Sequence, residues 1–236
     1  MNNKAALITG GADRIGRSIA LTFAELGFDV ALHYGQSKDK AEKTRDEIRE
    51  KGVKCNLYQR NLEDIKQVES LIPDVSADMD LFFLVNNASV FYPSRLRTSN
   101  YNDLVKVFSI NFFTPYILTQ EFAKYVKEGH IINLLDAKVN RNHTEHFNYL
   151  LTKKILFSFT KMSAVELAPE IRVNGIAPGP ILAPEDKGID YLEIAGSKTP
   201  LKKPGSLFNI TETIKYIVNN DYITGQIIYL DGGENL

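Results

Sequence analysis

The sequence has few of the features that mark secreted, membrane-spanning or nucleic-acid-binding proteins. Cys55 is its single cysteine, so the 236-residue chain can form no intrachain disulfide, which suits a reducing compartment. No apolar run approaches the roughly 18 residues that read as a transmembrane helix, and the first residues do not resemble a signal peptide. The formal net charge is −1, so no global basic field favours nucleic acid. We therefore expect a soluble cytoplasmic protein that binds neither membranes nor nucleic acid.

Histidine is also scarce, with 4 in the chain. His143 and His146 stand close together just before Tyr149, but no third ligand follows at a convincing spacing. We therefore predict that the protein holds no metal ion. Internal repeats and low-complexity tracts are absent as well, and a hydrophobic content of 44% suits one large domain over residues 1–236.

Short apolar runs alternate with longer amphipathic segments along the chain. This alternation predicts an α/β fold, a doubly wound parallel sheet of about seven strands with helices on both faces. The expected strands are 5–8, 30–34, 53–58, 81–85, 130–134, 171–176 and 226–230. The expected helices are 15–26, capped by Gly27, then 38–51, 65–72, stopped near Pro73, then 101–127, 145–168 and 209–219.

The segment 178–208 shows little periodicity and holds five prolines. A loop of this length inside a compact domain is usually functional, often a lid over a site. We expect it to form a substrate-binding loop, with a disordered excursion as the alternative.

A glycine-rich turn, Thr9–Gly10–Gly11–Ala12–Asp13–Arg14–Ile15–Gly16, stands between the first expected strand and the first helix. Glycine lets the backbone approach a pyrophosphate closely, and the helix N-terminus offers free N–H groups and positive potential. The position predicts a dinucleotide site, with a turn that only packs a helix on a strand as the alternative.

The end of the second strand discriminates between cofactors. An NAD site usually has an acidic residue here, for the ribose 2′-hydroxyl. The chain reads His33–Tyr34–Gly35–Gln36–Ser37–Lys38 and offers no carboxylate before Asp39. Arg14, His33, Ser37 and Lys38 supply donors and positive charge instead, which favours the 2′-phosphate of NADP(H).

Tyr149 and Lys153 are four positions apart, so a helix would bring them onto one face. An ammonium there stabilises a tyrosinate, so we expect Lys153 to lower the pKa of Tyr149 from roughly 10. Such a phenol could exchange a proton near neutral pH. Asp136 follows the apolar strand at 131–135 and could either accept hydrogen bonds in the site or serve as a helix N-cap.

These motifs together resemble the short-chain dehydrogenase/reductase family over nearly the whole chain. The turn at 9–16 is similar to the family's glycine motif, with Arg14 at the middle glycine. Asn86–Asn87–Ala88 is similar to its Asn-Asn-Ala-Gly segment, with Ser89 in place of the glycine. Further similarities are Asn111, the pair Tyr149 and Lys153, the segments 172–174 and 178–179, and the tail at 231–233. The resemblance implies a Rossmann-type fold and a homotetramer that pairs the helices at 101–127 and 145–168.

Several departures from the family resemble the pteridine reductase and dihydromonapterin reductase subgroup. Arg14, His33–Tyr34, the segment 87–93 and Asp136, where the family commonly has serine, occur together here. The resemblance implies catalytic roles for Tyr149, Lys153, Asp136 and Asn111. It implies substrate contacts from Arg14, Ser89, Phe91, Asp136 and Tyr149, while Ser89 could instead serve close backbone packing and Tyr92 could be a contact or a surface aromatic. It implies cofactor contacts from Gly10, Arg14, Ile15, Gly16, His33, Tyr34, Ser37, Asn61, Leu62, Asn87, Ala88, Lys153, Pro178 and Gly179.

Three functions follow from this interpretation. The first is NADPH-dependent reduction of a dihydropterin or a related N-heterocycle, with Tyr149 as proton donor. The second keeps the fold and cofactor but takes a 3-oxoacyl thioester or a small ketone. The third is a non-catalytic NADP(H)-binding sensor.

Overall fold

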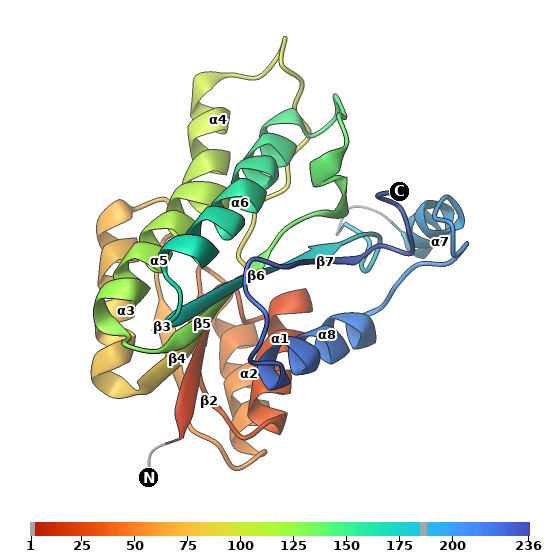
Figure 1. The fold of residues 1–236 in the computed structure, drawn as a ribbon. Helices are drawn as coiled ribbons and strands as arrows, with labels where there is room; N and C mark the ends of the chain where they lie inside the picture. The colour runs from red at the N-terminus through yellow and green to blue at the C-terminus, as the bar shows by residue number, and fades with distance from the viewer. Residues whose placement is uncertain (1–2, 185–187) are drawn as a thin grey trace.

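Seven parallel strands form one sheet in the order β3–β2–β1–β4–β5–β6–β7 (Figure 1). The protein is described by a computed structural model that covers residues 3–184 and 188–236. The strands are β1 Lys4–Ile8, β2 Asp29–Tyr34, β3 Cys55–Gln59, β4 Asp80–Asn86, β5 Gly129–Leu134, β6 Ile171–Pro178 and β7 Ile227–Leu230. The predicted α/β fold with a parallel sheet is confirmed.

Helices cover both faces of the sheet because successive strand residues point to opposite sides. In β1, Leu7 packs with one core and Ile8 with the other, and Leu84 and Val85 of β4 divide in the same way. One core is closed by α1 Arg14–Glu25, α2 Lys38–Arg49 and α8 Leu207–Asn219. The other is closed by α3 Ile65–Asp78, α5 Thr114–Tyr125 and α6 Phe147–Glu166.

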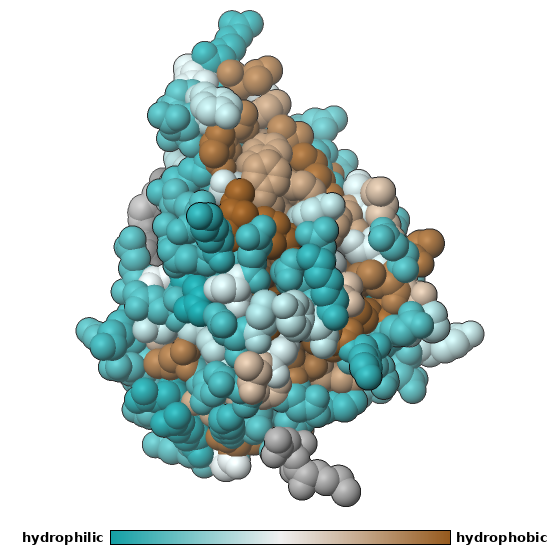
Figure 2. Space-filling model, turned by 90° about the vertical axis from the view of Figure 1, so that its left-hand side faces the viewer, coloured by the Kyte–Doolittle hydropathy of each residue, from teal (hydrophilic) through white to brown (hydrophobic). Residues whose placement is uncertain are grey.

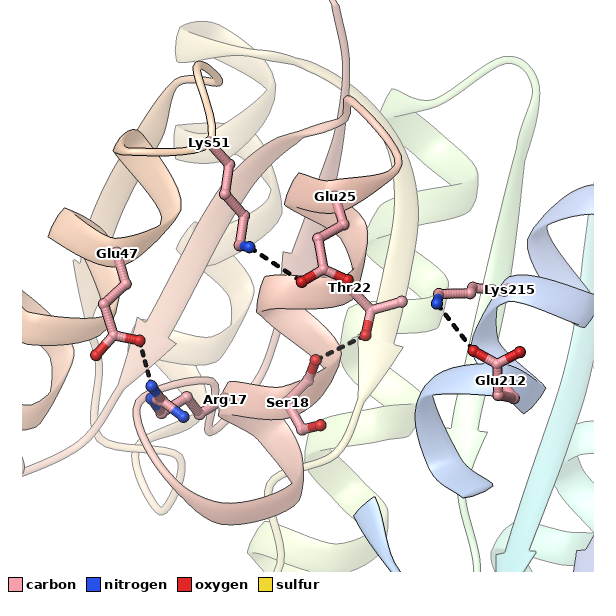
Figure 3. Close-up of polar contacts among 8 residues, drawn as sticks. All are labelled: Arg17, Ser18, Thr22, Glu25, Glu47, Lys51, Glu212 and Lys215. Atoms are coloured by element: carbon pink, nitrogen blue, oxygen red, sulfur yellow. Dashed lines mark hydrogen bonds and ion pairs between the residues drawn. The ribbon is translucent and has the colours of Figure 1, made fainter. Parts of the chain in front are cut away.

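Helix α1 begins and ends as its sequence indicates. The Asp13 side chain accepts a hydrogen bond from the Arg14 N–H at 2.8 Å, and Gly27 takes a left-handed φ of 84° after the last turn. Ion pairs between Arg17 and Glu47, and between Lys51 and Glu25, join α1 to α2 and the residues after it (Figure 3). Pairs as exposed as these add little free energy of folding, so the apolar face of α1 carries most of the packing.

Two expectations about helices were wrong. Helix α3 does not stop at Pro73 but continues to Asp78, because Leu71, Ile72 and Val75 bury their side chains against the sheet. Pro73 removes one helical hydrogen bond, and that burial offsets the loss. The sequence predicts no helix within the segment 178–208, which contains the helix α7 Ile189–Ser197.

The long helix expected over 101–127 is also interrupted. It consists of α4 Tyr101–Phe108, a π-helical turn Ser109–Phe113, and α5. The Thr114 N–H bonds to the Ser109 carbonyl, five residues back. Such single π-turns gather at functional sites, and Asn111 lies at the centre of this one.

The strand order reverses between β1 and β4, which lie side by side although β2 and β3 come between them in sequence. In parallel sheets, the carboxyl ends of the strands flank a crevice at such a reversal. None of the helices in residues 3–184 and 188–236 is long and apolar enough to cross a membrane.

Candidate active site

A groove of about 1070 Å³ runs over the carboxyl ends of β1 to β4. Eleven of the predicted site residues line it, namely Gly10, Arg14, Ile15, Gly16, His33, Ser37, Asn61, Leu62, Asn87, Ala88 and Ser89. Tyr92, considered as a contact or a surface aromatic, also lines it, and the sequence interpretation missed other members, among them Gln36, Lys40, Gln59, Arg60 and Lys106. Their side chains carry no motif, and only the folded chain brings them to this edge.

The glycine turn is shaped for close approach of a ligand to the backbone. Gly10 has a left-handed φ of 63°. A Cβ on Gly16 would lie 2.1 Å from the Gly10 carbonyl oxygen, so no other residue fits there. The Asn87 side chain donates to the carbonyls of Thr9 and Gly10, at 2.9 and 3.2 Å. These bonds fasten the end of β4 to the turn after β1.

Arg14 also has a left-handed backbone, with φ of 52°. This conformation suits the glycine of the motif that the turn resembles, and it costs a residue with a Cβ about 1 kcal/mol or more. The Arg14 guanidinium crosses the groove and donates to the Ala183 carbonyl at 2.6 Å. The side chain therefore links the glycine turn to the segment after β6.

His33 is placed in the groove wall as predicted, but it does not supply positive charge there. Its Nδ1 accepts from the Gly10 N–H at 3.0 Å and its Nε2 lies 3.2 Å from the Arg60 carbonyl. Burial lowers the pKa of His33 to about 4, so the ring is neutral. The expectation that His33 contributes charge was wrong because both of its nitrogens hold the backbone of the wall.

Four other predicted cofactor residues lie away from the groove lining, namely Tyr34, Pro178, Gly179 and Lys153. Tyr34 packs its ring into the core under α1 and α2, at 7% exposure. Pro178 ends β6, and the Gly179 N–H bonds to the Leu230 carbonyl at 2.9 Å. A Cβ on Gly179 would lie 2.8 Å from Asp231, so close packing against Asp231 accounts for the glycine at this position.

Asn61 and Leu62 follow β3 and form the far wall of the groove. The Asn61 side chain accepts from the Glu63 N–H at 3.0 Å, so its amide group faces out with two donors. Leu62 is buried, and its carbonyl accepts from the Thr114 hydroxyl at 3.0 Å.

Tyr149 and Asp136 are joined by a hydrogen bond. The Tyr149 hydroxyl donates to Asp136 Oδ2 at 2.9 Å, and Asp136 Oδ1 accepts from the Lys138 N–H at 2.8 Å. Asp136 therefore has both of the roles considered for it, since it caps the short helix Ala137–Asn140 and faces the tyrosine.

The pKa of Tyr149 is raised well above its ordinary value, first by burial and then by the negative charge of Asp136. The expectation that Lys153 lowers this pKa was wrong for this arrangement. The Lys153 ammonium lies 5.7 Å from the Tyr149 ring and donates to the Leu134 carbonyl at 2.7 Å. Tyr149 is thus a neutral phenol with its proton directed at a carboxylate.

Lys153 is 3% exposed, and α6 holds it against the end of β5. Burial lowers its pKa to about 8, while Asp136 acts in the opposite direction. A buried chain of hydrogen bonds fixes α6 on the sheet, because Asn86 donates to Asn133 at 2.8 Å and Asn133 donates to Thr160 at 2.9 Å.

Asn111 reaches the site from the π-helical turn and is fully buried. Its side chain accepts from the Val90 N–H at 2.8 Å and from the Ser89 hydroxyl at 3.2 Å, and it donates to the Val90 carbonyl at 2.9 Å. The side chain therefore holds the segment after β4, which is the segment that carries Ser89 and Phe91.

Phe91 stands beside the tyrosine, with ring centroids 4.7 Å apart and ring planes at 89°. His146 stacks on Phe91 at 3.8 Å. The sequence interpretation considered His146 only as a metal ligand. Within residues 3–184 and 188–236, no three His, Cys, Asp or Glu side chains converge as a metal site would require.

The low pKa of Lys153 predicts a pH dependence of stability. Between pH 8 and the unfolded value near 10.4, the unfolded chain binds more protons at this residue, so the free energy of unfolding rises with pH. Relative to a Lys153→Met variant, the wild type should gain about 2 kcal/mol between pH 8 and about 9.5. Urea unfolding of both proteins at several pH values measures this difference, and a constant difference would contradict the assignment.

The strained backbone of Arg14 predicts an ordering of two variants. Arg14→Ala and Arg14→Gly both lose the bond to Ala183, but only glycine relieves the left-handed conformation. Arg14→Gly should therefore unfold with a free energy about 1 kcal/mol higher than Arg14→Ala. Equal midpoints in urea would show that the position is not strained.

Comparison with known proteins identifies the family. A family model described as enoyl-(acyl carrier protein) reductase matches residues 10–235. The 3-oxoacyl-(acyl-carrier-protein) reductase FabG of Staphylococcus epidermidis is 35% identical over 246 residues, which cover 98% of each chain.

Solved structures give the same result. The FolM alternative dihydrofolate reductase 1 from Brucella canis, complexed with NADP, has a TM-score of 0.94 at 35% identity and covers 99% of this chain and 94% of its own. A short-chain dehydrogenase/reductase mutant from Serratia marcescens has a TM-score of 0.93 at 26% identity, covering 100% and 99%. The protein described here therefore belongs to the short-chain dehydrogenase/reductase family of oxidoreductases.

Proposed function

We propose that the protein is an NADPH-dependent oxidoreductase that reduces a dihydropterin or a related N-heterocycle, with Tyr149 as the proton donor. The observation that carries the proposal is the bond between the Tyr149 hydroxyl and Asp136. A carboxylate at this position accepts hydrogen bonds from ring N–H and amino groups, which a pterin offers and a ketone does not. The likeness to the FolM structures, named as dihydrofolate reductases complexed with NADP, supports the same conclusion.

The residues of the groove fit a dinucleotide. The glycine turn forms a cradle that a Cβ at residue 16 would fill, and the N-terminus of α1 faces the same groove. Gln36, Ser37 and Lys40 line its end near β2, and the Ser37 side chain caps no N–H of α2. We assign the 2′-phosphate to this end because Ser37 and Lys40 supply a hydroxyl donor and a positive charge there, although His33 is neutral. Arg14, Ile15, Asn61, Leu62, Asn87 and Ala88 would hold the rest of the cofactor.

Hydride transfer is the chemistry that a bound NADPH supplies. The protein then has to orient the substrate ring and deliver a proton. Asp136 would hold the ring donors, and the neutral phenol of Tyr149 would give up its hydroxyl proton. The Lys153 ammonium would stabilise the tyrosinate that this transfer leaves, and Asn111 would keep Ser89 and Phe91 in place. Arg14, Ser89 and Phe91 would make the remaining contacts with the substrate.

Reduction of a 3-oxoacyl thioester is the second candidate, because the FabG relatives are as similar to this chain as the FolM structures are. Asp136 argues against it, since an ionised carboxylate repels the oxyanion that develops on a ketone. A non-catalytic NADP(H) sensor fits less well, because Tyr149, Asp136 and the buried Lys153 remain assembled.

We also propose the homotetramer that pairs α4, α5 and α6 between copies. Figure 2 shows brown, apolar residues gathered over the upper half of one side of the molecule. Exposed apolar side chains on these helices and on the π-helical turn between α4 and α5 are Tyr101, Val105, Phe113, Tyr116, Tyr125, Leu151, Met162 and Val165. An apolar face of this kind is typical of a protein interface.

Three further proposals concern the whole chain. Residues 1–236 form one domain, and the segment 178–208 acts as its substrate-binding loop, which Arg14 contacts through Ala183. The cytoplasm is the location we propose. Cys55 is buried as a free thiol, and burial raises its pKa to about 12, which makes it unreactive toward disulfide exchange.

Two variants of Asp136 and one of Tyr149 test the proposed chemistry. Tyr149→Phe should lower kcat for dihydropterin by about a hundredfold to ten-thousandfold, since it removes the proton donor. Asp136→Asn keeps an oxygen for the Lys138 N–H, so its thermal stability should stay close to the wild type while activity falls. Asp136→Ala should lose activity and also about 1 kcal/mol of stability with the cap. The proposal fails if the wild type turns over ketones with NADPH but not dihydropterins.

The cofactor assignment predicts a role for Lys40. Lys40 pairs with Asp13, and we expect it to exchange this carboxylate for the 2′-phosphate when NADPH binds. Lys40→Ala should therefore raise the Kd for NADPH about tenfold more than the Kd for NADH, because a charged hydrogen bond to the 2′-phosphate is lost. Fluorescence titration of the reduced cofactors measures both constants. Lys43→Ala, an exposed position on the same helix outside the groove, is the matched control. Equal effects on NADPH and NADH would exclude the assignment.

A further inference from the structure

The start of α6, three residues before Tyr149, is built together with the segment after β4. His146 is the N-cap residue of α6 but makes no side-chain cap. Instead, the Phe147 N–H bonds to the Ser94 carbonyl and the Asn148 N–H bonds to the Ser94 hydroxyl, both at 3.0 Å. The Asn148 side chain also donates to the Ser99 hydroxyl at 2.6 Å. The helix that carries Tyr149 is thus capped by the segment that carries Phe91.

His146 adds an aromatic contact to this junction. Its ring lies nearly parallel to the Phe91 ring, with centroids 3.8 Å apart and planes at 17°. Its Nδ1 lies 3.1 Å from the Tyr92 carbonyl, which makes Nδ1 the protonated nitrogen that donates. The contact therefore fixes both the position and the tilt of the His146 ring.

Phe91 connects this junction to Tyr149 through a ring contact. Its ring meets the Tyr149 ring at 89° and 4.7 Å, and 44% of the residue remains exposed. His146 covers one face of Phe91, and the exposed part of Phe91, next to Tyr149, is the surface that we assign to a flat ligand. Flat rings stack favourably on such a surface.

We propose that His146 is a positioning residue that backs the Phe91 ring and so selects planar aromatic substrates. The proposal rests on the proposed function, since it assumes that a flat heterocycle is reduced at Tyr149. It adds a specific residue, outside the groove lining and outside the predicted site, that determines how well such a ring binds. His146 touches neither cofactor nor reacting atoms in this assignment, so it acts only through Phe91.

The backbone explains why histidine suits this position. His146 has φ of 55° and ψ of 41°, a left-handed conformation in which histidine and asparagine are enriched among residues with a Cβ. The position also requires a donor for the Tyr92 carbonyl and a flat ring for Phe91. Asparagine supplies the backbone and a donor without the ring, and phenylalanine supplies the ring without the donor.

These differences define the experiment. His146→Asn, His146→Phe and Phe91→Leu are compared with the wild type and with the double variant His146→Asn/Phe91→Leu. Steady-state KM and kcat for dihydropterin, the inhibition constant of methotrexate as a flat pteridine, the Kd for NADPH and the melting temperature are measured. The melting temperature and the Kd for NADPH report on structural damage. The KM for dihydropterin and the inhibition constant of methotrexate report on binding to the Phe91 ring.

We expect His146→Asn to raise KM and the methotrexate inhibition constant about fivefold to tenfold, with kcat changed by less than about threefold. The Kd for NADPH and the melting temperature should stay at the wild-type values. His146→Phe should recover most of the ring-dependent binding. In the Phe91→Leu background, the His146→Asn change should have almost no further effect, because the two residues act as a unit.

Three results would overturn the inference while leaving the proposed function intact. They are an unchanged KM in His146→Asn, full additivity with Phe91→Leu, and a lower KM, which would mean that His146 occupies the face that the substrate needs. A wild type that neither reduces dihydropterin nor binds methotrexate would overturn both the inference and the proposed function.

Discussion

The hydrogen bond between Tyr149 and Asp136 determines the chemical character of the site. It ties a phenol to a carboxylate beside a buried ammonium, and the charge of Asp136 raises the pKa of both Tyr149 and Lys153. Burial opposes this effect at Lys153 and reinforces it at Tyr149. Tyr149 stays protonated and Lys153 stays largely charged at neutral pH. The high pKa makes Tyr149 a weak acid in this arrangement, so proton transfer from it would depend on the Lys153 ammonium to stabilise the tyrosinate.

This charge arrangement depends on the edge of the sheet where four strands end. Thr9 holds the two central strands in register beyond their last ladder bonds, because its hydroxyl accepts from the N–H groups of Asn87 and Ala88 at 2.9 and 3.0 Å. The groove for the cofactor and the segment that carries Phe91 therefore start from one fixed point. Arg14 extends the same connection across the groove to Ala183.

Much of the fold could be predicted from the sequence, and the exceptions have physical reasons. The strands were predictable because residues buried on both faces form apolar runs such as that at 81–85. The helix end predicted near Pro73 was wrong because local helix propensity contains no information on the burial of Val75, two residues later. Helix α7 was not predicted because the prolines at both ends of the segment 178–208 indicate a loop, although nine residues between them form a regular helix.

The candidate site also has features that could be predicted from the sequence and features that could not. Residues in motifs, such as Gly10, Gly16 and Asn87, lie where the pattern indicates because backbone geometry demands them. Charge states were less predictable, since they depend on burial and on partners distant in sequence. His33 is neutral because the fold encloses it, and Tyr149 is a weaker acid than expected because of its burial and the negative charge of Asp136.

The π-helical turn at Ser109–Phe113 has a consequence for how this region evolves. One additional residue per turn shifts the angular phase of everything that follows, so the apolar stripe of α5 is rotated relative to that of α4. Removing a single residue there would restore one continuous helix and turn Asn111 away from Val90. Single-residue insertions and deletions are therefore less tolerable in these few positions than in the surface loops.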